Sequence, residues 1–427
     1  MMKELSIYIH IPFCVRKCLY CDFLSFPMAK DTDLWKKADI RLAADVRKCK
    51  DKWKTYGVES YVNLLRWEIT QSAALYQKYR VISIFLGGGT PSLLPADLIS
   101  RIMETVRANY RMAENAEVTM EMNPGTIENG EPEQYITCGI NRVSIGLQSA
   151  DDEELRRIGR IHDYASFLKT YDLVRGAGFR NVNIDIMAAL PGQDTASYER
   201  TLRKVTALAP EHISAYSLIL EEGTPLYVRQ SEYSFPTEEE DQEMDRLTRQ
   251  YLDSCGYHRY EISNYAKDGY ECRHNKVYWQ RGDYVGFGLG ASSMVQNVRW
   301  SNPDTMERYA MYVMSAESKH GDDGAEYGRL IEVNGQGEPE TRYIPYRQVL
   351  SRQEQMEEYM FLGLRMVCGV SAAKFEHIFG SPIEDIYGET IECLRQQGLL
   401  VRDGDEISLT ERGLDVSNYA MSQFLFD

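Results

Sequence analysis

The chain has 427 residues, with 48 Lys and Arg against 64 Asp and Glu, a formal net charge of −16. This length excludes a single small module and predicts one large domain with a smaller one. With 43% hydrophobic and 26% charged residues, the composition is that of a globular protein and excludes wholesale disorder. The negative charge repels phosphate backbones, so nucleic acid is not expected as a partner.

The N-terminal sequence MMKELSIYIHIPFC lacks the features of a secretory signal, and the chain contains no long apolar run. We therefore expect a soluble, cytoplasmic protein. Three of the nine cysteines lie within eight residues near the start. That crowding favours metal ligation in a reducing compartment over a secreted disulfide framework.

Six apolar, β-branched segments are predicted to be strands, and helical patterns separate them. The segments are residues 6–11, 81–86, 117–122, 142–147, 181–190 and 212–220. Alternation of strands and helices predicts a parallel α/β sheet, with functional groups at the carboxyl ends of the strands. The pattern alone does not separate a partly closed barrel of six units from an open doubly wound sheet.

We predict four regions along the chain: a barrel at 1–235, an annex at 236–315, a loop or linker at 316–350 and a C-terminal domain at 351–427. The last region predicts three helices, a hairpin turning at Asp403 and Gly404, and a final helix, which is winged-helix-like. Its six Lys and Arg against fourteen Asp and Glu argue against DNA binding. We interpret it as a cap or a docking module.

Cys14, Cys18 and Cys21 form a C-x3-C-x2-C pattern directly after the first predicted strand. Three thiolates on one tight loop can hold three irons of a [4Fe–4S] cluster and leave the fourth iron open, because closed clusters normally take four cysteines. The alternative is a zinc knuckle. Zinc requires four ligands, commonly in paired C-x2-C halves, and the sequence offers no second pair. The other six cysteines are expected to be small buried hydrophobic residues.

The cysteine pattern, with Tyr20 before its last member, resembles the radical S-adenosylmethionine (SAM) proteins. The segments YIHIPFC and GGGTP resemble the oxygen-independent coproporphyrinogen III oxidase group, and nearly the whole chain follows the order of motifs in that group. The resemblance implies a partial (β/α)6 TIM-like radical SAM barrel with a C-terminal winged-helix-like domain. It also implies that the open iron is chelated by SAM.

Carrying the family's SAM contacts over by position predicts a set of residues at the strand ends and in two short motifs. The glycines of LGGGTP allow close backbone approach and positive φ angles, although a plain strand-to-helix turn is the structural alternative. Glu121 suits ribose hydroxyls, and Arg160 suits the SAM carboxylate; each charged member has an ion-pair alternative. The full set is Tyr8, Tyr20, Gly88, Gly89, Thr90, Glu121, Gln148, Arg160 and Asp185.

Two features separate the branches of this group. True oxidases have a fourth cysteine two residues after the third, where this chain has Phe23. Residues 274–279 contain the motif H-N-x-x-Y-W in full, which is typical of the heme-chaperone branch. The resemblance therefore implies a protein that takes up heme and passes it to respiratory hemoproteins.

His274 is the predicted heme contact, because histidine is the commonest axial ligand and the neighbouring aromatic rings offer a flat surface. Cys272 is a competing ligand, and a structural role for His274 is a serious alternative. His10 faces either SAM or the porphyrin.

The alternative function is enzymatic, the oxidative decarboxylation of coproporphyrinogen III, and a radical enzyme with an unrelated substrate is a third class. No side chain is predicted to act as a general acid or base. Whether SAM gates dimerisation or is cleaved during transfer is left open. The expected partners are heme and heme-accepting respiratory proteins, with peripheral membrane contact and a homodimer as further expectations. The basic stretch at 29–59 is interpreted as a solvated insertion rather than as a patch for an acidic partner or the membrane.

Overall fold

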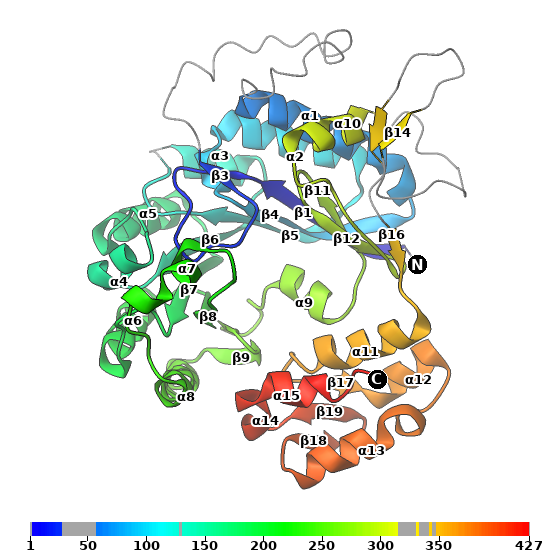
Figure 1. Ribbon diagram of the computed structural model, residues 1–427. Coiled ribbons are helices and arrows are strands. Elements are labelled where there is room, and N and C mark those ends of the chain that lie inside the picture. The colour runs from blue at the N-terminus through cyan, green and yellow to red at the C-terminus, as the bar shows by residue number, and fades with distance from the viewer. Residues whose placement is uncertain are drawn as a thin grey trace. The chain divides into compact units, whose positions relative to one another are not determined.

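The computed structural model describes residues 2–27, 57–127, 130–314, 330–332, 341–343 and 347–426 (Figure 1). Most of the basic stretch at 29–59 and most of the linker at 316–350 lie outside these residues. The chain divides into two compact units, each assembled from separated stretches. The first is Met1–Ser144, Ala165–Arg180 and Tyr284–Gln348, and the second is Ile145–Tyr164, Asn181–Asp283 and Val349–Asp427. The four-region division made from the sequence stays a prediction.

The first unit is built on a sheet with the strand order β16-β13-β12-β11-β1-β4-β5. Strand β1 lies between β4 and β11 and is parallel to both, so that Tyr8 is level with Phe85 and Gly286. Four apolar residues of β1, at alternate positions, are fully buried. The strands are β1 (Lys3–Ile11), β4 (Tyr79–Gly88), β5 (Met112–Met122), β11 (Tyr284–Phe287), β12 (Ser292–Val295), β13 (Val298–Ser301) and β16 (Arg347–Val349).

Helices cover this sheet, and α1 and α2 pack against each other (Figure 1). Their apolar residues recur at helical spacing and are buried, as in α2 with Leu98, Ile102 and Val106. The helices are α1 (Val58–Ser72), η4 (Ala73–Tyr76), η5 (Pro91–Leu93), α2 (Ala96–Asn109), α3 (Glu131–Thr137), α5 (Tyr164–Ala177) and α10 (Met306–Met314). Short strand pairs are β2 (Phe13–Cys14) with β3 (Phe26–Pro27), and β14 (Leu330–Glu332) with β15 (Thr341–Tyr343).

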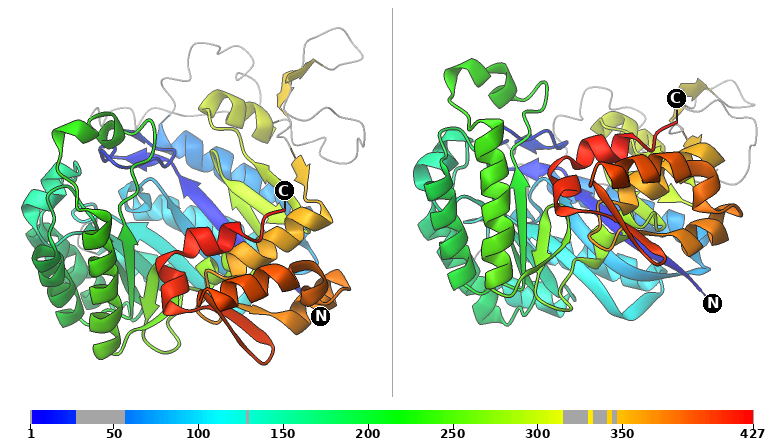
Figure 2. Two further views of the ribbon diagram at one scale, coloured as in Figure 1. Left: turned by 60° about the horizontal axis from the view of Figure 1, so that its bottom comes forward. Right: turned by 90° about the horizontal axis from the view of Figure 1, so that it is seen from below.

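The second unit continues the strand–helix alternation, and its long helix α8 packs against α6, both green in Figure 2. Strand β7 is parallel to β8, while β10 is antiparallel to both β8 and β9. The strands are β7 (Val182–Ala188), β8 (His212–Ser217), β9 (His258–Glu261) and β10 (Asn264–Ala266). The helices are α4 (Asp152–Arg157), α6 (Thr195–Ala207), α7 (Pro225–Val228), η6 (Gln230–Glu232), α8 (Glu238–Ser254) and α9 (Arg273–Trp279).

The six predicted strands are confirmed as β1, β4, β5, β6 (Arg142–Gln148), β7 and β8. The boundary between the two units falls inside β6. Among the described residues, the order of hydrogen-bonded strands has two different ends, β16 and β9, and does not form a ring. The fold is therefore a mixed α/β sheet that is not closed, in agreement with the predicted partial barrel.

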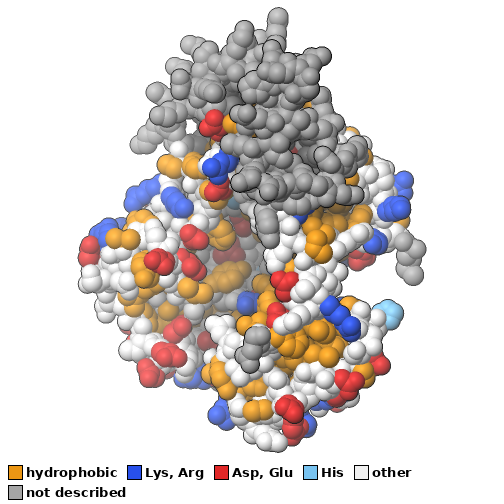
Figure 3. Space-filling model, turned by 45° about the vertical axis from the view of Figure 1, so that its right-hand side comes forward, with side chains coloured by type: hydrophobic (Ala, Val, Ile, Leu, Met, Phe, Trp, Pro, Cys, Tyr) orange, Lys and Arg blue, Asp and Glu red, His pale blue; other side chains and the backbone are white. Residues whose placement is uncertain are grey.

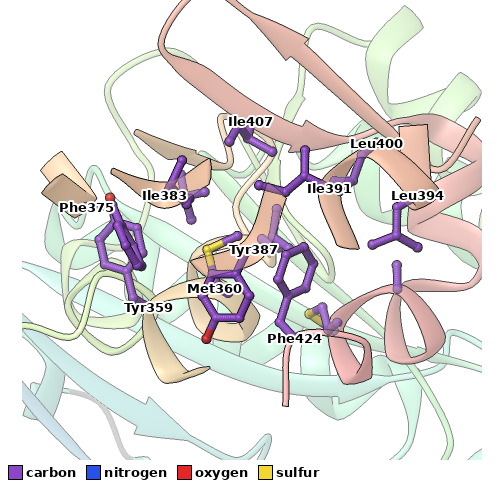
Figure 4. Close-up of a cluster of buried hydrophobic side chains, with 14 of the residues drawn as sticks. Tyr359, Met360, Phe375, Ile383, Tyr387, Ile391, Leu394, Leu400, Ile407 and Phe424 are labelled. Carbon is purple, nitrogen blue, oxygen red and sulfur yellow. The ribbon is translucent and has the colours of Figure 1, made fainter. Parts of the chain in front are cut away.

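The C-terminal domain has its own hydrophobic core, in which Tyr359, Phe375, Tyr387 and Phe424 pack together (Figure 4). Gly404, with φ of +58°, turns the predicted hairpin. The single final helix expected from the sequence is instead two short ones. The elements are α11 (Arg352–Gly363), β17 (Val370–Ser371), α12 (Ala372–Phe379), α13 (Ile383–Gln396), β18 (Leu400–Asp403), β19 (Glu406–Leu409), α14 (Glu411–Asp415) and α15 (Ser417–Ser422). No helix in the described ranges is long and apolar enough to cross a membrane.

Candidate functional site

The three clustered cysteines lie on the cluster loop (residues 12–25), which follows β1. Cys14, Cys18 and Cys21 are all free thiols of intermediate exposure. The loop turns tightly, because the backbone N–H of Cys21 donates to the carbonyl of Cys18 at 3.3 Å. Burial raises the pKa of the Cys21 thiol, and the proximity of Cys18 and Cys14 adds to the rise.

Thiolates are the ligands that iron–sulfur clusters take, so the donors on this loop fit three irons of a [4Fe–4S] cluster. Within the described ranges, no three His, Cys, Asp or Glu side chains already stand in a metal-binding arrangement. The Thr90 hydroxyl donates to the Cys14 sulfur at 3.6 Å, and the Asn123 amide donates to that hydroxyl at 2.7 Å. The loop thus holds the correct donors, and the glycine segment (residues 87–90) contacts one of them.

The glycine segment is docked onto the cluster loop by its backbone. The N–H of Gly89 donates to the carbonyl of Ile11 at 2.8 Å, and that of Thr90 to the carbonyl of Phe13 at 2.7 Å. A Cβ on Gly89 would lie 2.6 Å from these same two oxygens. Gly89 is therefore required by protein packing, which is a physical reason for glycine besides its predicted approach to SAM.

His10 fills the space beside Gly88. Gly88 has φ of +104°, and a Cβ there would lie 2.3 Å from the His10 ring. Both ring nitrogens of His10 are engaged, Nδ1 with the Tyr8 hydroxyl at 3.0 Å and Nε2 with the carbonyl of Leu24 at 2.8 Å. Because a carbonyl only accepts, Nε2 carries the proton, and burial lowers the pKa of the ring. His10 therefore secures the end of the cluster loop, a role that the sequence did not suggest.

A buried carboxylate on α1 also contributes to the hydrogen-bond network around the cluster loop. Glu68 on α1 is 2% exposed and accepts hydrogen bonds from the Gly288 N–H at 2.8 Å, the Tyr309 hydroxyl at 2.7 Å and the Asn302 amide at 2.8 Å. Two turns earlier on α1, the Tyr61 hydroxyl donates to the carbonyl of His10 at 2.6 Å. The signal that could have revealed Glu68 is its place at an apolar position of the helical pattern.

Glu121 lies at the carboxyl end of β5, as predicted. Its carboxylate accepts a hydrogen bond from the N–H of Gly88 at 3.1 Å. Tyr8, Tyr20 and Glu121 are all of intermediate exposure. The first unit thus gathers the three cysteines, Tyr8, the glycine segment and Glu121 around the ends of β1, β4 and β5.

The remaining predicted SAM contacts belong to the second unit. Gln148 is the last residue of β6 and has φ of +71°, which is unusual for a residue other than glycine. The turn after it is fixed by Glu154, a buried carboxylate that accepts from the hydroxyls of Ser149 and Ser197, each at 2.6 Å. The strained backbone at Gln148 is thereby held in place.

Arg160 follows α4, and its N–H donates to the carbonyl of Leu155 at 2.9 Å. Nearby, the Nε2 atom of His162 contacts the carbonyl of Leu147 at 3.2 Å. Burial, aided by the positive charge of Arg160, lowers the pKa of His162 to about 4. His162 is therefore neutral near pH 7.

Asp185 ends a chain of hydrogen bonds that we call the polar relay (Asp185, Asn183, His212, Tyr260 and Cys272). Asp185 accepts from the Asn183 amide at 2.7 Å, and the Asn183 oxygen accepts from His212 Nδ1 at 2.6 Å. His212 Nε2 accepts from the Tyr260 hydroxyl at 2.9 Å, and that oxygen accepts from the N–H of Cys272 at 3.3 Å. Every donor points toward Asp185, so the relay joins a predicted SAM contact to the start of α9.

Helix α9 carries the H-N-x-x-Y-W motif and buries its most conspicuous residues. His274 is 1% exposed, and its Nε2 atom lies 2.9 Å from the Tyr278 hydroxyl, with the two rings edge to face. Cys272 is 0% exposed. For either residue to bind iron, the protein around it would have to open.

Two family models match the chain. The Radical SAM superfamily model covers residues 8–205, and the HemN C-terminal domain model covers residues 350–416. The first match contains the cluster loop, the glycine segment and every predicted SAM contact. The second overlaps the predicted C-terminal region at 351–427 and ends at residue 416.

Curated relatives match along the full length. The heme chaperone HemW of Lactococcus lactis is 30% identical over 100% of this chain and 99% of its own, and that of Escherichia coli is 32% identical over 99% of each. Among solved structures, the radical SAM enzyme coproporphyrinogen III oxidase HemN of Escherichia coli has a TM-score of 0.76 at 21% identity, covering 99% of this chain and 90% of its own. That structural likeness concerns the fold.

Proposed function

Because the chain belongs to the HemW family, we propose that it is a heme chaperone that carries a [4Fe–4S] cluster and SAM. The observation that supports this most strongly is the similarity to heme chaperones over nearly the full length of both chains. The exposed Phe23, at the position of the oxidases' fourth cysteine, supports the same branch.

In this proposal Cys14, Cys18 and Cys21 hold three irons of the cluster. The proposed SAM contacts are Tyr8, Tyr20, Gly88, Gly89, Thr90, Glu121, Gln148, Arg160 and Asp185. When bound, the cluster would supply an open iron that SAM can chelate. The protein's own contribution is to hold the loop, through His10, Tyr61 and Glu68, so that the three sulfurs keep one arrangement.

Heme is the cargo in this proposal, and α9 with His274 forms part of its binding region. The acceptors are respiratory hemoproteins, reached from the cytoplasm by peripheral contact with the membrane, and the protein acts as a homodimer. Three clustered thiols suit a reducing compartment, which supports the cytoplasmic location.

The test is a titration of the cluster-loaded, full-length protein with hemin under anaerobic conditions, followed by Soret absorption. Saturable binding of one heme per chain, and transfer of that heme to an apo-cytochrome, is the expected result. A parallel incubation with coproporphyrinogen III, SAM and a reductant should give no decarboxylated porphyrin. Product formation coupled to SAM consumption, without saturable heme binding, would make the protein an enzyme instead.

A further inference from the structure

The polar relay contains two buried polar side chains, Asn183 and His212, that the proposed function does not use. They are 1% and 0% exposed, whereas the face of the molecule drawn in Figure 3 displays hydrophobic, acidic and basic side chains. Polar side chains are costly to bury unless they are hydrogen-bonded, and a buried network that is satisfied makes its members rigid. The relay ends at Asp185, a proposed SAM contact, so the inference drawn from it rests on the proposed function.

The pairing of β7 with β8 places four polar side chains side by side. Asn183 is level with His212, and Asp185 is level with Ser214. Side chains two residues apart on a strand lie on the same face, so all four share one face of the sheet. His212 is the first residue of β8, and Asp185 lies two residues nearer the carboxyl end of β7 than Asn183. The relay therefore supports Asp185 from the amino ends of the strands.

The two ends of the relay fix the direction of every hydrogen bond in it. The backbone N–H of Cys272 can only donate, and the carboxylate of Asp185 can only accept. Because the Tyr260 oxygen accepts from Cys272 at 3.3 Å, its hydroxyl proton is free to go to Nε2 of His212 at 2.9 Å. His212 is thereby the tautomer that carries its proton on Nδ1.

This tautomer sets the orientation of the Asn183 amide. The amide oxygen accepts from His212 Nδ1 at 2.6 Å and from the Ser214 hydroxyl at 3.2 Å. The amide nitrogen then donates to Oδ1 of Asp185 at 2.7 Å. A reversed amide would turn its oxygen toward the carboxylate and repel it. One carboxylate oxygen of Asp185 is therefore held in place, and the rotation of the carboxylate is restricted.

We propose that Asn183, His212 and Tyr260 are positioning residues for SAM, which hold the Asp185 carboxylate in the orientation that meets the ligand. A group that is already held in its binding orientation gives tighter binding, because less conformational freedom is lost when the ligand arrives. Tyr260 acts on Asp185 through His212 and Asn183. Its hydroxyl therefore affects SAM affinity from two side chains away.

The test measures the SAM dissociation constant of the full-length, cluster-loaded protein by anaerobic equilibrium dialysis. Tyr260→Phe removes only the hydroxyl that donates to His212, and it should weaken SAM binding about threefold to fivefold. Tyr257→Phe is the matched control. It also removes one hydrogen-bonded hydroxyl, which donates to the carbonyl of Pro210 at 2.7 Å outside the relay, and it should leave SAM affinity unchanged.

A double variant separates a positioning role from a structural one. Asp185→Ala should weaken SAM binding at least about tenfold, and adding Tyr260→Phe to it should cause no further loss. Residues that act through one another have non-additive effects, whereas a general loss of stability adds to the loss from Asp185→Ala.

Unchanged SAM affinity in Tyr260→Phe, an equal loss in Tyr257→Phe, or additive losses in the double variant would each overturn the proposal. If Asp185→Ala binds SAM as tightly as the unmodified protein, Asp185 is not a contact and the relay does not position SAM, although the rest of the proposed function stands. If the unmodified, cluster-loaded protein shows no saturable SAM binding, it is the proposed function itself that fails.

Discussion

The cluster loop and helix α9 differ in how far the residues of their sequence motifs are buried. On the cluster loop the three cysteines are partly exposed, and the residues that support them, His10, Tyr61 and Glu68, are buried. On α9 the motif residue His274 is itself buried, whereas its neighbour Lys276 is of intermediate exposure. The residues of a sequence motif can thus be partly exposed in one region and buried in another, and this difference is visible only in the structure.

The largest effect is expected for the partly exposed cysteines of the cluster loop. Replacing Cys14, Cys18 and Cys21 together by Ala removes every predicted iron ligand, so cluster content should fall to zero. Iron and sulfide analysis after anaerobic reconstitution measures this, with Cys393→Ala as the matched control. Retention of cluster iron by the triple variant would contradict the assignment.

Substitutions of Glu68 test the buried hydrogen-bond network that supports the cluster loop. Glu68→Ala leaves three buried donors without an acceptor and should lower the free energy of unfolding by about 3–5 kcal/mol. Glu68→Gln keeps the volume and should cost less, about 2 kcal/mol, because an amide still accepts from some of the donors. Urea unfolding of the cluster-free protein gives both values; an effect below 1 kcal/mol for Glu68→Ala would show that the network is not structural.

His212 tests the polar relay in the second unit. His212→Ala removes one hydrogen bond from the Asn183 oxygen and one from the Tyr260 hydroxyl and opens a cavity, so the free energy of unfolding should fall by about 3 kcal/mol. Amide hydrogen exchange at Cys272 should also become faster, since its acceptor Tyr260 is released. Thr206→Ala, at a partly exposed position on α6, is a control that should leave that exchange unchanged.

His162 gives a pH dependence. Its folded-state pKa of about 4 lies below the unfolded value of about 6.5. As pH falls from 6.5 to 4, the unfolded chain takes up a proton that the folded chain refuses, so stability is lost over this range. The loss should be roughly 2 kcal/mol at pH 5. His162→Gln should lose less stability between pH 7 and pH 5 than the unmodified protein; equal losses would count against a buried, neutral His162.

The smallest effect on heme affinity is expected for His274. His274→Ala should alter heme affinity less than about threefold if the histidine only supports α9. Its cost should appear as a lower melting temperature instead. Asn275→Ala, on the same helix, provides the comparison for heme affinity.

The sequence predicted the six strands because each is an apolar, β-branched run between helical patterns. It also predicted the cluster loop, since three thiols at that spacing have few other uses. It did not predict His10, Glu68 or Glu154 as supports, because their roles depend on partners far away in the chain, such as Gly288 for Glu68. The burial of His274 was likewise invisible, since one histidine beside aromatic residues suits a ligand or a core position equally.

The cluster loop follows β1, and β1 pairs with β11, a strand that is synthesised much later in the chain. Strand β1 is flanked on one side by β11, and Gly288 and Gly290 pack against His10 and Leu24 at the two ends of the cluster loop. A ribosome adds about 5–20 residues per second, so the cysteines wait roughly 15–50 s for their supporting strand. A chain released before residue 284 would display the complete cysteine motif on an incomplete sheet. A cluster loop with all its supporting strands therefore requires at least about the first two thirds of the chain.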